Sequence, residues 1–109
     1  MPLTKNEYIE QQFQKELEEF TMLGDKVPPH IWNGLANYVL RGQGTGDFLY
    51  AMLTNDLGGV MRHADDTNIR TLHATYGFLY NGTYVPSECW GSMGKVKAWQ
   101  QYGGLFGER

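Results

Sequence analysis

The chain has 109 residues but a single cysteine, Cys89, and only 19% of its residues are charged. One cysteine excludes an internal disulfide framework and is typical of a protein kept in a reducing compartment. No apolar run approaches the roughly 20 residues that a membrane span needs. The N-terminus also lacks the basic and then apolar segments of a secretory signal. The sequence therefore predicts a cytoplasmic protein without a membrane-spanning segment.

Basic residues are few and form no stripe, and the negative charge is concentrated at one end. Nine lysines and arginines stand against twelve acidic residues, which gives a formal net charge of −3. Residues 1–25 contain two basic and six acidic residues, or −4, whereas residues 26–109 contain seven and six, or +1. A protein that binds DNA or RNA needs cations to displace counterions from phosphate. We therefore expect no direct contact with nucleic acid.

Apolar residues recur at helical spacing along most of the chain, whereas the alternation typical of a strand is confined to residues 83–86. The hydrophobic content of 41% and the aromatic content of 14% are too high for a disordered chain. The length suits one domain. The sequence predicts one compact all-α domain of five or six helices. Residues 1–25 form an acidic N-terminal helix in this prediction, and residues 26–109 form the helical core.

Capping residues mark where the predicted helices begin and end. Thr4 and Glu7 form a capping box at the start of the first helix, and Gly24 is expected to end it. A single helix is predicted from Asp65 or Asp66 to Asn81. The last helix is expected to end at Gly103, and the tail that follows is expected to be frayed.

Side chains that could carry chemistry do not occur at the spacings of known active sites and metal centres. His30, His63, His73 and Cys89 are potential metal ligands, but no H-x-x-x-H, H-E-x-x-H or C-x-x-C spacing connects them. The glycine-rich stretch 42–46 lacks the lysine and Ser/Thr of a phosphate-binding loop, so we interpret it as a connection between helices. The sequence predicts no catalytic residue, metal site or cofactor, and hence a protein that is not an enzyme.

A group of polar and aromatic side chains lies near the predicted helix ends. If those ends converge, the group forms a ligand pocket with guanidinium groups for an anion, amides for a base edge and aromatic faces for stacking. Its members are Asn55, Arg62, Asn68, Arg70, Tyr80 and Trp90. The alternative is structural, because Asn55 and Asn68 are typical helix caps and Arg62 could pair with a carboxylate.

The polar face of the first helix is the second candidate site. Its carboxylates could dock on a lysine- and arginine-rich surface of a partner protein. They are Glu10, Glu16, Glu18 and Glu19. A glutamate-rich face is also what any solvated helix presents, so both interpretations stay open.

Residues 29–105 resemble a family of short accessory proteins encoded by tailed phages and prophages. The resemblance rests on the blocks GDFLYAMLTNDL (46–57), RHADDTN (62–68), FLYN (78–81), CWGS (89–92), KVKAW (95–99) and GGL (103–105). It implies a phage origin, expression in the host cytoplasm and a non-enzymatic accessory role, and it implies no catalytic residue. The acidic helix before Pro28 is an addition to the family pattern.

Small phage proteins of this kind work by stoichiometric binding, which gives the leading hypothesis. The chain is expected to be an anti-CRISPR-like antagonist of host defence whose acidic or aromatic surface covers a basic nucleic-acid site on a host effector complex. One alternative is a sponge that sequesters a defence signalling nucleotide, such as a cyclic dinucleotide or an ADP-ribose derivative. Another is a structural or regulatory phage protein. The fifteen aromatic residues also make a homo-oligomer conceivable, because they exceed what a small helical domain must bury.

Overall fold

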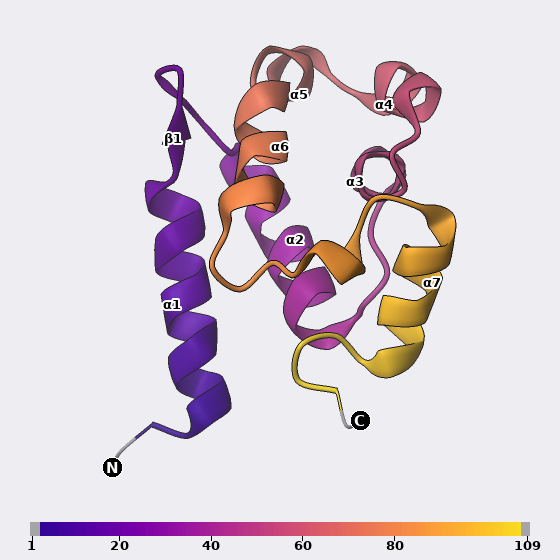
Figure 1. Ribbon diagram of the computed structural model, residues 1–109. Helices are drawn as coiled ribbons and strands as arrows, with labels where there is room; N and C mark the ends of the chain where they lie inside the picture. Colours follow the sequence, from indigo (N-terminus) through magenta and orange to yellow (C-terminus); the bar gives the residue numbers. More distant parts are fainter. Residues whose placement is uncertain (1–2, 108–109) are drawn as a thin grey trace.

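The computed structural model describes residues 3–107, which fold into helices around a shared hydrophobic core (Figure 1). This confirms the predicted all-α domain. The elements in chain order are α1 (Lys5–Glu19), β1 (Thr21–Met22), β2 (Asp25–Lys26), α2 (Pro29–Arg41), α3 (Asp47–Leu53), α4 (Leu57–His63), α5 (Asp66–Arg70), α6 (Leu72–Asn81), the 3-10 helix η1 (Ser87–Cys89) and α7 (Met93–Tyr102).

The capping box at the start of α1 is confirmed, but the predicted end of this helix is wrong. The Glu7 amide donates to Thr4 Oγ1 and the Thr4 amide donates to the Glu7 carboxylate, both at 3.1 Å. These hydrogen bonds lower the pKa of Glu7. The helix ends at Glu19, because Phe20 adopts an extended backbone and its ring packs edge-on against Phe78.

A short antiparallel hairpin, β1 and β2, begins within residues that were predicted to belong to the end of the first helix. Its two-residue turn has positive φ at both positions, 53° at Leu23 and 84° at Gly24, as a type I′ turn requires. Gly24 is left-handed, but it lies in the turn of a hairpin, whereas it was predicted to end a helix. A Cβ at Gly77 of α6 would collide with Met22, so this glycine allows the hairpin to pack closely on α6.

Three further expectations differ from the structure. The helix predicted from Asp65 to Asn81 is interrupted at Thr71, whose hydroxyl donates to the Thr67 carbonyl at 2.7 Å and competes with the helical pattern. Residues 3–107 therefore contain seven α-helices, more than the expected five or six. Residues 83–86 form no strand, because the Thr83 amide donates to a carboxylate of α1 and Pro86 has no amide to donate.

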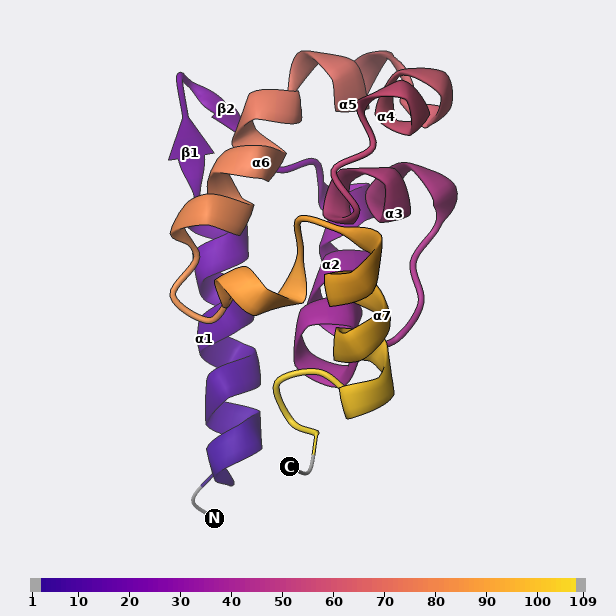
Figure 2. The same ribbon diagram turned by 45° about the vertical axis from the view of Figure 1, so that its right-hand side comes forward.

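Helix α2 is the centre of the core. Figures 1 and 2 show it between α1 on one side and α7 on the other. Phe13 and Leu17 of α1 are fully buried in the cluster that also contains Leu35, Val39 and many other apolar side chains. The acidic N-terminal segment therefore shares one hydrophobic core with the remainder of the chain.

The C-terminal end of α2 is buried, and other parts of the chain supply its hydrogen-bond donors. The Trp99 indole N–H is shared between the carbonyls of Tyr38 and Val39, at 3.2 and 3.1 Å. The amides of Leu105 and Phe106 donate to the carbonyls of Val39 and Leu40, both at 2.9 Å. The tail is therefore packed onto α2 as far as residue 107, and the expectation of a frayed tail is wrong over residues 103–107. The rest of the tail lies outside the described residues.

We predict that Gly104→Ala is strongly destabilising. Gly104 has a φ of 76°, and a Cβ there would collide with the backbone of Arg41 and Gly42. The expected loss in the free energy of unfolding is about 3 kcal/mol, measured by urea denaturation. Gly24→Ala is the matched control, since its φ is 84° but no atom lies within 4 Å of the added Cβ. It should cost only about 1 kcal/mol, and equal losses in the two variants would contradict the close approach of the tail to α2.

Candidate functional site

Two of the four glutamates predicted to bind a partner have contacts within the fold. Glu10 accepts a hydrogen bond from Arg41 Nη2 at 2.7 Å, which ties α1 to α2. Glu16 accepts from both the amide and the hydroxyl of Thr83, each at 2.6 Å, which ties α1 to the loop after α6. These two carboxylates hold the fold together and are only partly exposed.

The other two glutamates, Glu18 and Glu19, are exposed near the C-terminal end of α1. Glu18 accepts a hydrogen bond from Gln14 of the same helix at 2.6 Å, and the Glu19 side chain has no partner within residues 3–107. The hairpin continues directly from this end of the helix (Figure 1). We call the surface formed by Glu18, Glu19 and Leu23 the α1–hairpin edge.

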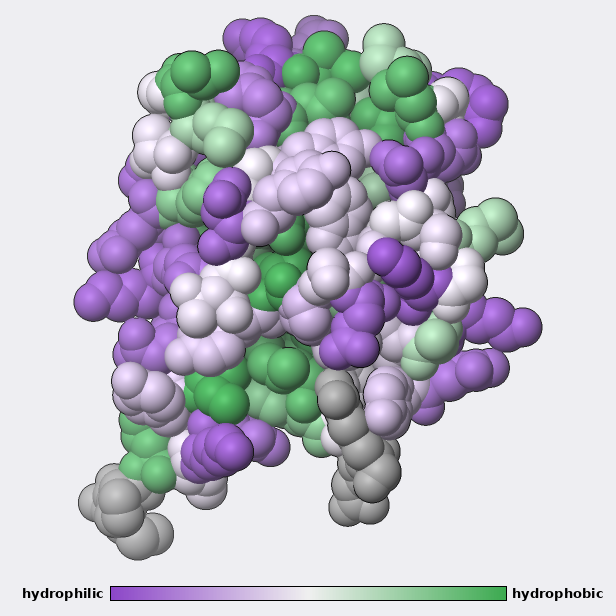
Figure 3. All heavy atoms as spheres, in the orientation of Figure 1, coloured by the Kyte–Doolittle hydropathy of each residue, from purple (hydrophilic) through white to green (hydrophobic). Residues whose placement is uncertain are grey.

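Leu23 at the hairpin tip is unusual in two respects. Its side chain is 87% exposed, and its φ of 53° is a left-handed conformation that costs a residue with a branched apolar side chain about 1–2 kcal/mol. Figure 3 shows hydrophobic atoms at the hairpin tip, above a largely hydrophilic α1. An exposed, conformationally strained leucine contributes nothing to the core.

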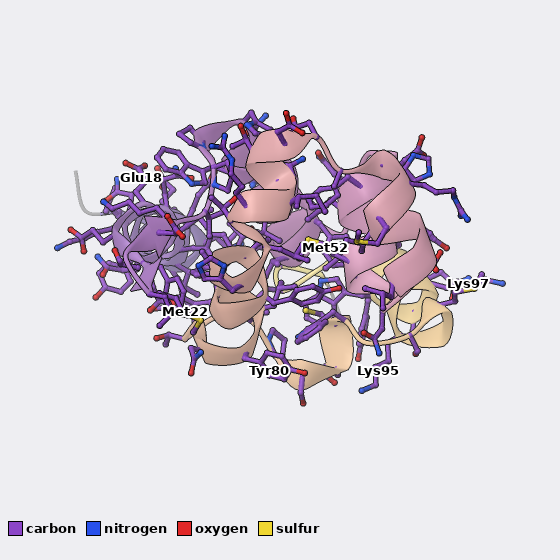
Figure 4. The ribbon with its side chains drawn as sticks, turned by 90° about the horizontal axis from the view of Figure 1, so that it is seen from above. Glu18, Met22, Met52, Tyr80, Lys95 and Lys97 are labelled. Carbon is purple, nitrogen blue, oxygen red and sulfur yellow. The ribbon has the colours of Figure 1, made fainter. Side chains whose placement is uncertain are left out.

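The structure brings together three of the six residues predicted to form one pocket. Asn55, Tyr80 and Trp90 line a cavity of about 240 Å³, which we call the aromatic cavity, and Lys95 completes its wall. Figure 4 shows Tyr80 on α6 and Lys95 on α7 along the same side of the molecule.

The other three predicted pocket residues lie elsewhere. Arg62 lines a separate cavity of about 370 Å³ beside α3 and α4, and Asn55 borders both cavities. Asn68 is buried. Its backbone N–H donates to the Asp65 carboxylate at 2.7 Å, and its side-chain oxygen lies 2.8 Å from His30 Nε2. Arg70 is exposed and its Nε donates at 3.3 Å to the Asp66 carbonyl of its own helix. Asn68 therefore has a structural role, as the alternative interpretation expected, but its side chain connects α5 to α2 and does not cap a helix.

The aromatic cavity is built by the ends of α6 and η1 and the start of α7. Trp90 is 8% exposed, and the Tyr80 ring, 76% exposed, meets it edge-to-face with centroids 4.9 Å apart. The Gly91 amide donates to the Leu53 carbonyl at 2.7 Å, which fixes the chain after Trp90. Lys95 Nζ donates at 3.4 Å to the Ser87 carbonyl, and Ser92 caps α7 by accepting from the Lys95 amide. The sequence analysis did not include Lys95 among the pocket residues, although the sequence places it only five residues after Trp90, at the start of the last predicted helix.

The histidines and the cysteine do not gather into a reactive cluster. No group of three or more His, Cys, Asp or Glu residues in the described part of the chain is placed to hold a metal ion. His73 Nε2 lies 3.0 Å from the Asp25 carboxylate, without the alignment of a hydrogen bond. Cys89 is fully buried, and this burial raises the pKa of its thiol to about 12. The thiol is therefore protonated at neutral pH and is not a nucleophile there.

Neither the helices nor the comparisons with known proteins point to a particular class of site. Within residues 3–107, every helix is too short or too polar to cross a lipid bilayer. Comparison with protein-family models, with curated proteins and with solved structures found no match to this chain.

We predict that the buried thiol makes the fold sensitive to alkaline pH. The pKa of Cys89 rises from its ordinary value of 9.0 to about 12 on folding. Above pH 9 the unfolded chain therefore releases a proton that the folded chain retains, so stability is full below pH 9 and declines as the pH rises towards 12. By pH 10 this group should cost about 1 kcal/mol, measured by denaturant titration.

Cys89→Ala is the control for this prediction, because it removes the titrating group from a buried site. Burial also raises the pKa of Tyr38, so the variant should keep a smaller alkaline loss. An unchanged pH profile in Cys89→Ala would contradict the assignment to Cys89.

Proposed function

We propose that the protein works by stoichiometric binding, as a phage-type antagonist of host defence. Its α1–hairpin edge covers a basic surface that a host effector complex uses to bind nucleic acid, in the manner of an anti-CRISPR protein. The observation that carries the proposal is the pairing of two exposed carboxylates, Glu18 and Glu19, with the exposed and strained Leu23. The resemblance to phage accessory proteins supports the proposal, in which the protein acts in the host cytoplasm.

The negative charge of the N-terminal segment supports binding to a partner with a basic surface. Residues 1–25 carry a net charge of −4, and within the described residues neither the Glu18 nor the Glu19 carboxylate forms an ion pair. Lys26 of the hairpin donates to the Glu18 backbone carbonyl at 3.4 Å and leaves that carboxylate unpaired. Figure 4 shows Glu18 at the opposite end of the molecule from Lys97, so the negative charge is separated from the lysines of α7. Complementary potential steers association and excludes partners of the wrong sign.

The second feature that supports the proposal is Leu23, whose exposed apolar side chain can be buried in the partner. Glycine, asparagine or aspartate would fit the first position of a type I′ turn without strain, and each would also suit solvent. A leucine there costs stability in the free protein, and strain of this sort is typical of functional positions. Burial of its side chain in a partner would contribute about 1.5–3 kcal/mol to binding.

Charge reversal on the α1–hairpin edge is the test of this proposal. The chain is expressed in a host that carries a CRISPR defence, and plating of a targeted phage is measured. The wild-type chain should restore plating, and Glu18→Lys with Glu19→Lys should reduce that protection at least about tenfold. Glu10 and Glu16 are left unchanged, because their contacts with Arg41 and Thr83 hold the fold.

The matched control compares two single substitutions that each replace a carboxylate by a lysine. Glu19→Lys lies on the edge and Asp66→Lys lies on α5, and both positions are exposed. Only Glu19→Lys should weaken protection, while both variants keep the circular dichroism spectrum of the wild type. Equal loss in the two variants, or full protection by the folded double reversal, would contradict binding through this edge.

We predict that Leu23→Asn separates stability from function. Asparagine tolerates positive φ and forms the preferred Asn-Gly turn with Gly24, so the free energy of unfolding should rise by about 1 kcal/mol. Protection in the plating assay should fall, because the apolar anchor is removed. A variant that gains stability and keeps full protection would show that Leu23 does not contact the partner.

A further inference from the structure

The aromatic cavity has the features of a ligand site that the proposed partner surface does not use. None of its lining residues belongs to α1 or to the hairpin. Trp90 is more than nine-tenths buried, yet its indole N–H has no hydrogen-bond partner within residues 3–107 and is not sealed from solvent. A buried indole N–H is usually hydrogen-bonded, and this unpartnered donor belongs to a residue that lines the cavity.

The polar groups around Trp90 converge on the same space. Lys95 Nζ lies beside the residue that follows Trp90, since a Cβ on Gly91 would be 3.8 Å from it. The ammonium donates one long hydrogen bond, 3.4 Å, to the Ser87 carbonyl, which leaves two of its three protons for a ligand. The side-chain amide of Asn55 has no hydrogen-bond partner among the described residues, whereas its backbone N–H donates to the Met52 carbonyl at 3.1 Å and its φ is 61°.

We propose that the aromatic cavity binds a small planar aromatic anion, with the ring against Trp90 and the anionic group at the Lys95 ammonium. The Tyr80 ring is mostly exposed, so it can rotate from its edge-to-face contact with Trp90 and pack against the ligand ring without disturbing the core. The Asn55 amide and the Trp90 indole N–H then bond polar atoms on the rim of the ligand ring. Aromatic stacking and one charge-assisted hydrogen bond are the principal attractions.

The volume limits the part of the ligand that the cavity encloses. The cavity holds about 240 Å³, which is less than the roughly 300–1,000 Å³ of pockets that enclose drug-sized molecules. A single aromatic ring system with one anionic group fits this space, and the remainder of a larger ligand would extend from the open side of the cavity. The same chemistry occurs in nucleoside monophosphates and in aromatic carboxylates, so the test includes both.

The binding test is a titration of the full chain, in which the NMR chemical shifts of the amide and indole N–H groups are measured at each ligand concentration. Adenosine 5′-monophosphate and indole-3-acetate are the anionic probes, and adenosine and indole-3-ethanol are their neutral counterparts. At least one anion should give saturable shifts at Tyr80, at Lys95 and at the Trp90 indole N–H. Its neutral counterpart should bind about tenfold more weakly, because it lacks the group that meets the ammonium. The pair that responds identifies the phosphate or the carboxylate source.

Three variants test whether the anion binds in the aromatic cavity. Lys95→Gln should weaken binding of the anion about tenfold, and Tyr80→Ala should weaken it about fivefold. Asn55→Gly keeps the positive φ and removes only the side-chain amide, so it should weaken binding about threefold. Lys97→Gln is the control, since this exposed lysine of α7 does not line the cavity and should leave affinity unchanged.

Three results would overturn the proposal. The first is no saturable shift with either anion at concentrations up to about 10 mM, which corresponds to negligible affinity. The second is binding whose shifts map away from Tyr80, Trp90 and Lys95. The third is a folded Lys95→Gln variant that binds the anion as tightly as the wild type.

Discussion

Helix α2 ends inside the protein, where its last carbonyl groups cannot bond to water. The final four carbonyls of any helix lack partners within the helix, and leaving them buried without donors would cost several kcal/mol. The Trp99 indole and the amides of Leu105 and Phe106 supply those donors. This requirement brings α7 and the C-terminal tail onto α2 and makes Gly104 necessary at the closest approach.

The same end of α2 determines which charges remain on the surface. Arg41, its last residue, pairs with Glu10 of α1 and places its guanidinium over the ring of Phe106, 5.5 Å from the centroid. Glu16 fastens the other side of α1 to the loop at Thr83. The acidic helix is therefore part structural support and part free surface, and the free part is the end that leads into the hairpin.

The sequence predicted the all-α class and several helix starts, but it did not predict where every helix ends or how the helices contact one another. Caps are local, so the roles of Thr4, Asp65 and Ser92 could be read from neighbouring residues. The end of α1 could not, because Phe20 leaves the helix to meet Phe78, which lies far along the chain. The distribution of the pocket residues among separate cavities, and the tie between Asn68 and His30, depend on how short helices pack. Local spacing does not encode that packing.

In the function that we propose, the protein occupies a surface and does not transform a substrate. The most direct measurement is the amount of purified chain needed to stop a purified effector complex from binding its nucleic acid. We expect inhibition to be immediate and to saturate when chain and effector binding sites are equal in number, and to weaken as salt is raised. Inhibition that develops with time at a small fraction of that amount would require turnover and would contradict the account.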